Sequence, residues 1–168
     1  MARDRRIAVI GVGNEFRRDD GVGAAVVAGL REQADGLPLP PCTVLAVCDG
    51  DPARLIGLWE DAGLAVVVDA AHAHPGHPGR VHRLELDAGQ SARSGSTSSH
   101  GLGLGEAVEL ARALGRLPGR LVVYAVEGAD GSFGTGLSPA VTASLEPLVD
   151  TVRDEITRYR SASGRRLP

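Results

Sequence analysis

The sequence predicts an α/β fold, a single mostly parallel twisted sheet of about five strands with helices on both faces. Short apolar runs rich in valine and isoleucine recur along the chain, and segments of helical periodicity lie between several of them. Most of these runs are apolar at successive positions, as strands covered on both faces require. With 168 residues, the chain is long enough for one sizeable core and too short for two ordinary domains.

Five segments are expected to be strands. Four are continuous apolar runs, and the fifth alternates apolar and polar side chains, which indicates a half-exposed strand at a sheet edge that can run antiparallel. The expected strands are residues 7–10, 43–47, 64–68, 81–86 and 121–126, of which 81–86 is the edge strand.

Four helices are expected between and after these strands. In two of them, an Asp or Ser residue suited to capping is followed by proline at the first helical position, which favours a helix start. The expected helices run from Asp19 or Asp20 to about Gln33, from Asp51-Pro52 onward, over residues 104–114, and from Ser138-Pro139 to the end of a single domain at residue 160, with 161–168 as a disordered tail.

A glycine-rich turn, residues 11–23, directly follows the first strand. The Rossmann pattern needs its third glycine where this chain has Phe16, and a P-loop needs a lysine, which the chain lacks. The turn instead places carboxylates at the carboxyl edge of the sheet, where open α/β sheets usually build their sites. Asp19 is most simply interpreted as a helix cap, whereas Asp20 is a candidate functional residue.

Two further residues complete a candidate site. Asp69 ends an otherwise apolar strand, where a buried charge costs several kcal/mol unless it is paired or bound to a metal. His100 precedes the third predicted helix. Each of Asp20, Asp69 and His100 lies at an element boundary, and such boundaries can share one sheet edge. Two carboxylates and an imidazole are suitable ligands for nickel or zinc.

Five short motifs occur in an order and approximate spacing that resemble those of the [NiFe]-hydrogenase maturation endopeptidases. The opening motif is Gly11-Val12-Gly13-Asn14 followed by Asp19-Asp20-Gly21-Val22-Gly23, and the others are Asp49-Gly50, Val68-Asp69-Ala70, His100-Gly101-Leu102 and Gly136-Leu137-Ser138-Pro139. The resemblance implies an α/β peptidase that removes the C-terminal extension from the nickel-loaded precursor of a hydrogenase large subunit. That precursor would be its partner and the source of the nickel.

Carried over residue by residue, the resemblance makes Asp20, Asp69 and His100 both the catalytic and the nickel-binding residues. Asp49 and Gly50 would contact the substrate peptide, although family members often have a second glycine where this chain has Asp51. Sequence leaves open whether a carboxylate or a metal-bound water performs hydrolysis. The alternative function is a non-catalytic chaperone that checks nickel insertion with the same ligands.

Other features argue against other functions. A net charge of −3 with interspersed signs speaks against nucleic acid, no apolar stretch could span a membrane, and a cytoplasmic location is expected. Cys42 and Cys48 cannot form a disulfide framework, and Cys48 lacks a cysteine-protease signature. Four histidines between His72 and His82 are interpreted as a solvated loop, because prolines interrupt any regular ligand geometry.

Overall fold

A computed structural model describes residues 6–87 and 102–165, in which strands and helices largely alternate. The elements are β1 (Ile7–Val12), the 3₁₀ helix η2 (Arg18–Gly21), α1 (Val22–Gln33), β2 (Thr43–Cys48), α2 (Pro52–Trp59), β3 (Leu64–Ala71), β4 (Val81–Asp87), α3 (Leu102–Leu114), β5 (Arg120–Glu127) and α4 (Pro139–Gly164).

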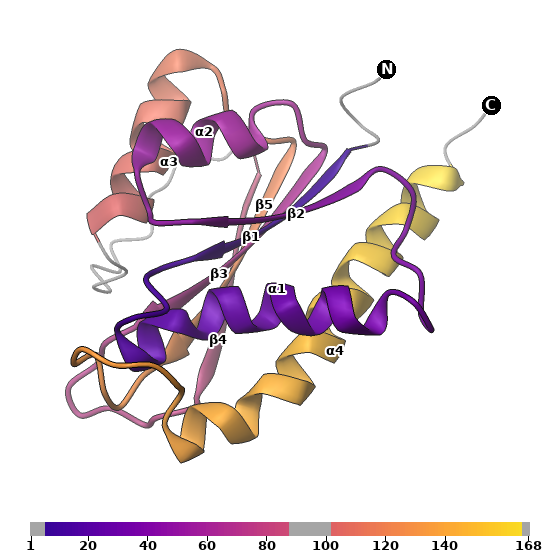
Figure 1. The fold of residues 1–168 in the computed structure, drawn as a ribbon. Coiled ribbons are helices and arrows are strands. Elements are labelled where there is room, and N and C mark those ends of the chain that lie inside the picture. The colour runs from indigo at the N-terminus through magenta and orange to yellow at the C-terminus, as the bar shows by residue number, and fades with distance from the viewer. Residues whose placement is uncertain (1–5, 88–101, 166–168) are drawn as a thin grey trace.

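The strands form one sheet in the order β2-β1-β3-β5-β4 (Figure 1). Neighbouring strands are parallel except at the β4 edge, where β4 pairs antiparallel with β5. The predicted fold class is therefore confirmed, including the alternating edge strand. Parallel strands end at the same edge, so β1, β2 and β3 deliver the residues that follow them to one side of the molecule.

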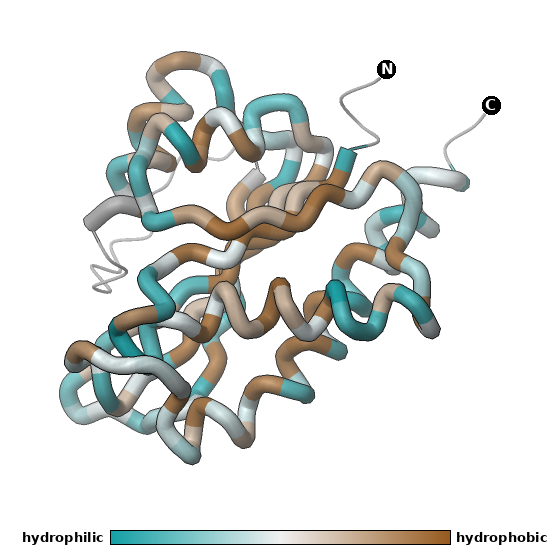
Figure 2. Tube along the Cα trace, in the orientation of Figure 1, coloured by the Kyte–Doolittle hydropathy of each residue, from teal (hydrophilic) through white to brown (hydrophobic). Residues whose placement is uncertain are grey.

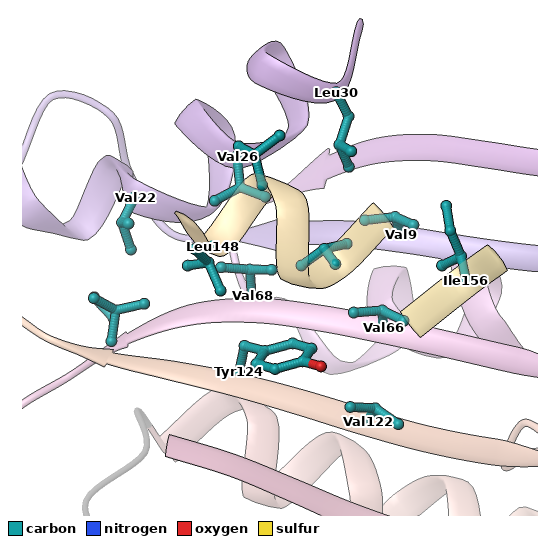
Figure 3. Packing of buried hydrophobic residues seen from close by; sticks show 14 of the residues in the cluster. Val9, Val22, Val26, Leu30, Val66, Val68, Val122, Tyr124, Leu148 and Ile156 are labelled. Atoms are coloured by element: carbon teal, nitrogen blue, oxygen red, sulfur yellow. The ribbon is translucent and has the colours of Figure 1, made fainter. Parts of the chain in front are cut away.

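Two layers of helices cover the sheet, α1 and α4 on one face and α2 and α3 on the other (Figure 1). The strands, which lie between these two helix layers, are strongly hydrophobic (Figure 2). Side chains that point to alternate faces divide the buried apolar residues into two clusters. Figure 3 shows the cluster under α1 and α4, where Val26 and Leu148 approach strand residues such as Val68.

A charged cluster anchors α4 to the far strands of the sheet. Glu155 of α4 accepts hydrogen bonds from Arg83 Nε (3.0 Å) and Nη2 (3.0 Å) and from the hydroxyl of Tyr124 (2.5 Å). Burial raises the pKa of Glu155, but Arg83 and Tyr124 outweigh this and hold the pKa below its ordinary value. The same environment, burial first and then Glu155, raises the pKa of Tyr124 to about 12.

The helix starts agree with the sequence in two places and differ in one. Asp51 caps α2 by accepting the N–H of Ala53 at 2.9 Å, and α4 begins after Ser138. The cap interpretation of Asp19 is wrong, because Asp19 lies inside η2 and the residue before α1 is Gly21. At the other end, α4 continues through the boundary predicted at residue 160 as far as Gly164.

Within the described residues, the helices are too short or too polar to cross a lipid bilayer.

Candidate active site

The carboxyl ends of β1 and β2 are joined at the edge of the sheet. The N–H of Gly13 donates to the carbonyl oxygen of Cys48 at 3.0 Å, which extends the parallel pairing by one step beyond β1. Residues 13–17 then form a turn that leads into η2. η2 carries the first of the predicted site residues, Asp20.

Asp20 is held by the glycine turn. Its Oδ2 accepts the N–H of Asn14 at 2.8 Å. Gly13 has φ 134°, and a Cβ there would lie only 2.1 Å from the carbonyl oxygen of Asp20. Any other residue at position 13 would therefore push the Asp20 loop outward as well as straining the backbone.

The start of α1 lies unusually close to the sheet because both contacting residues are glycines. A Cβ on Gly11 would meet the carbonyl oxygen of Gly23 at 2.3 Å, and one on Gly23 would meet that of Val68 at 2.5 Å. Val68 directly precedes Asp69, so this close approach brings the first turn of the helix, with Asp20 just before it, beside the end of β3.

Asp69 lies in β3 opposite Ala125 of β5 and is only 6% exposed. Burial is the main cause that raises its pKa to about 7, the charge of Asp20 raises it further, and the N–H of Ala70 opposes both. Asp20 and Asp69, which the sequence placed in one site, are thus brought together at the same edge. No basic side chain in the described part of the chain forms an ion pair with Asp69.

His100, the third predicted ligand, lies outside the described residues. Among the residues that are described, no group of three or more His, Cys, Asp or Glu side chains is close enough to hold a metal ion. Asp20 and Asp69 by themselves therefore form an incomplete site. Oxygen donors of this kind would contribute only part of the coordination shell of a divalent metal.

Asp49 and Gly50 follow β2 at the same edge. The exposed carboxylate of Asp49 accepts the N–H of Asp51 at 3.2 Å and lies 3.5 Å from Arg54, and these two interactions, in that order, lower its pKa. Gly50 has φ 96°, and a Cβ there would touch Val12 at 3.5 Å. This loop therefore adjoins the glycine turn, while Asp51, the departure from the family pattern, serves as the cap of α2.

Asp19 has a structural role that the sequence did not reveal. Its buried carboxylate accepts hydrogen bonds from the N–H groups of Ala129 (2.7 Å), Asp130 (3.0 Å) and Ser138 (2.7 Å) and from the Ser138 hydroxyl (2.8 Å). Burial alone would raise its pKa, but these donors hold the pKa below the ordinary value. The sequence signal that could have indicated this contact is the presence of both Asp19-Asp20 and Gly136-Leu137-Ser138-Pro139 in the chain.

Asp19 belongs to a wider contact between the glycine turn and the loop that joins β5 to α4. The N–H of Arg18 donates to Gly134 O at 3.1 Å, and the N–H of Gly134 donates to Phe16 O at 2.8 Å. The guanidinium of Arg17 lies 4.3 Å from the ring centre of Phe133. The loop with Asp20 is thus fixed on two sides, by the sheet and by residues 128–138.

The structure also bears on the residues to which the sequence assigned no chemical role. Cys48 is buried, and burial is the largest cause of its raised pKa, which is opposite to what a thiolate nucleophile needs. The loop with His72 and His74 is exposed. The carboxylate of Glu127 fixes the position of this loop: its Oε1 accepts the N–H of His77 at 3.0 Å, and its Oε2 lies 2.8 Å from Nε2 of His82.

A mixed α/β sheet with a glycine turn and two interacting carboxylates at its carboxyl edge defines the class: an open-sheet α/β protein with an acidic site at the strand ends. Within that class, the family model described as HycI, hydrogenase maturation protease, matches residues 45–155. The chain belongs to the hydrogenase maturation protease family, a family of peptidases.

Individual relatives agree with this assignment. The chain is 29% identical over 149 residues to the hydrogenase 2 maturation protease of Escherichia coli, covering 88% of each protein. It superposes on the hydrogenase maturating endopeptidase HybD of E. coli with a TM-score of 0.71 and 25% identity, covering 91% of this chain and 93% of that one. A hydrogenase 2 maturation peptidase from a Thaumarchaeota archaeon gives a TM-score of 0.65 and 26% identity, covering 89% and 97%.

Proposed function

We propose that this protein cleaves the C-terminal extension from the nickel-loaded precursor of a [NiFe]-hydrogenase large subunit. The observation that carries the proposal is the buried Asp69 carboxylate beside Asp20, at the edge of a sheet that belongs to a maturation protease. A carboxylate buried with no basic partner among the described residues is costly to ionise. An incoming cation would relieve that cost, so the site favours a substrate that brings its own metal.

In the proposed reaction, nickel is part of the substrate. Asp20, Asp69 and His100 complete its coordination, and this interaction holds the scissile peptide bond at the edge of the sheet. A water oxygen adds to the peptide carbonyl carbon, the C–N bond breaks, and the leaving amine takes up a proton. A carboxylate of the site that is not bound to nickel can accept a proton from that water, a role worth roughly 10²–10⁴ in rate; in the metal-free protein, burial raises the pKa of Asp69 to about 7.

Asp49 and Gly50 are assigned to the substrate peptide. Their loop adjoins the glycine turn, and Asp49 is exposed. Because Gly50 has a positive φ and no side chain, the backbone at this point leaves room for a peptide to approach closely. A side chain at position 50 should therefore weaken processing of the precursor, and it would also strain the backbone at φ 96° and touch Val12.

The test is to mix metal-free protein with precursor prepared with and without nickel and to follow the mass of the large subunit. We expect loss of the extension only from nickel-loaded precursor, with Asp20→Asn as the inactive control. Equal processing of both precursors would contradict the role of nickel. Stable binding of the nickel-loaded precursor without loss of mass would instead indicate the non-catalytic nickel-checking function.

A further inference from the structure

The strand β2 forms one edge of the sheet, and its outer side is open in the described part of the chain. The bond from the N–H of Gly13 to Cys48 O fixes the parallel register, so the even-numbered residues of β2 turn their backbone groups toward β1. The residues whose N–H and C=O groups point away from the sheet are Thr43, Leu45 and Val47.

The sequence of β2 itself lacks the residues that usually protect an exposed edge strand. The β2 sequence TVLAVC contains no charged residue and no proline, and its Val44 and Val47 side chains are 42% and 49% exposed. Of the outward backbone groups, the carbonyl oxygen of Leu45 accepts a hydrogen bond from Nη2 of Arg31 at 3.3 Å. A flexible surface arginine is readily displaced by another donor.

The open edge leads directly to the candidate active site. β2 ends at Cys48, and the next residues are Asp49 and Gly50, which adjoin the glycine turn before Asp20. A chain added outside β2 would lie two inter-strand spacings, roughly 10 Å, from the end of β1. About three extended residues cover that distance.

We propose that the substrate's C-terminal segment binds in extended form along the outer edge of β2, as a sixth strand, and then crosses the end of β1 to reach Asp20 and Asp69. This inference rests on the proposed function, which supplies a peptide as the ligand. The peptide's backbone pairs with Thr43, Leu45 and Val47 and displaces Arg31 from Leu45 O. Its side chains contact Val44 on one face and Val47 on the other.

A proline at position 47 tests this pairing. Val47→Pro removes an outward N–H and leaves the bonds to β1 intact, as proline at sheet edges generally does. We expect kcat/KM on the nickel-loaded precursor to fall about tenfold or more. This is the effect of losing one hydrogen bond and leaving its acceptor on the peptide without a donor. Val47→Ala keeps the N–H and should lose clearly less. An equal loss in the two variants would show that the side chain, and not the backbone, is recognised.

Val81→Pro is the matched control on the opposite edge. The N–H of Glu127 donates to Arg80 O, so the next residue of β4, Val81, has its N–H directed away from β5. This variant should process precursor at the wild-type rate. Thermal unfolding of all three variants shows whether each is folded.

A second measurement reads the pairing directly. Amide hydrogen exchange is followed in the Asp20→Asn protein with and without nickel-loaded precursor. We expect slower exchange at Thr43, Leu45 and Val47 when precursor is present. Unchanged exchange along β2, with protection elsewhere, would overturn the inference. So would protection that grows with protein concentration alone, which would mean that a second copy of the chain covers this edge.

The two proposals fail in different ways. If the wild-type protein does not shorten the precursor, the proposed function is wrong, and the exchange experiment still decides whether β2 receives the extended segment. If the wild-type protein cleaves and Val47→Pro cleaves equally well, the function stands and the edge-strand inference is wrong.

Discussion

Asp69 is 6% exposed and lies near the charge of Asp20, so in the free protein its ionised form is unfavourable and predominates only above its pKa of about 7. Asp69→Asn removes that charge and nearly keeps the shape of the side chain. We expect it to raise the free energy of unfolding at pH 8, by at most on the order of 4 kcal/mol, because the pKa of Asp69 rises from 3.8 to about 7 on folding. Processing of the precursor should be lost in the same variant.

The pH dependence of this effect has a definite sign. The pKa of Asp69 rises from its ordinary 3.8 to about 7 on folding, so between these values the folded protein binds more protons than the unfolded chain. This group therefore makes the wild-type protein less stable as pH rises from about 4 to about 7. Urea unfolding at pH 5 and pH 8 should show the advantage of Asp69→Asn shrinking at the lower pH. An advantage that grew toward pH 5 would contradict the assignment.

Asp19 and Asp20 are adjacent and chemically identical, yet they should respond in opposite ways to the same substitution. In Asp19→Asn, an amide replaces a buried carboxylate that accepts four hydrogen bonds. We expect the free energy of unfolding to fall by about 2–4 kcal/mol. Asp20→Asn should melt close to the wild type but fail to cleave the precursor. Thermal unfolding and the mass assay on both variants test this contrast. Equal melting temperatures would mean that the Asp19 contacts contribute little.

Among the elements, α4 depends on a polar contact as well as on its apolar face. Tyr124→Phe removes the hydroxyl that donates to Glu155 while leaving both bonds from Arg83. We expect a loss of about 1 kcal/mol in unfolding free energy, the usual net value of such a bond. Chemical denaturation of the purified variant measures it. A gain in stability would show that the hydrogen bond from the Tyr124 hydroxyl does not offset the free energy needed to bury it beside the Glu155 charge.

Elements with a local signal were predictable from the sequence. The strands followed from continuous apolar runs, β4 from its alternation, and the start of α2 from Asp51-Pro52, because each depends on a few neighbouring residues. The pairing of Asp20 with Asp69 followed from the rule that parallel strands end together. The Asp19 contacts could not be derived this way, since its partners lie 110 to 119 positions along the chain. The open edge of β2 required the strand order, which periodicity does not contain.

At the scale of the whole molecule, we expect nickel to be bound in the complex with the precursor and not in the free protein. With only Asp20 and Asp69 together in the described structure, the coordination of a metal ion is incomplete. We expect purified protein to contain little nickel by elemental analysis and to bind added Ni²⁺ weakly in calorimetry. Binding should strengthen as pH rises toward about 7, because Asp69 must lose its proton. A tightly bound, stoichiometric metal in the purified protein would contradict this.

The four hydrogen bonds to Asp19 also bear on how much order the substrate must impose. They close a loop of the chain during folding, so the segment before Asp20 has lost most of its conformational freedom before any precursor arrives. When a binding site is already rigid, binding does not have to order it, so less of the interaction free energy is lost and the affinity is higher. Ser138→Ala removes the hydroxyl that donates to Asp19 and should therefore weaken binding of the precursor, although Ser138 lies 118 residues from Asp20 along the chain.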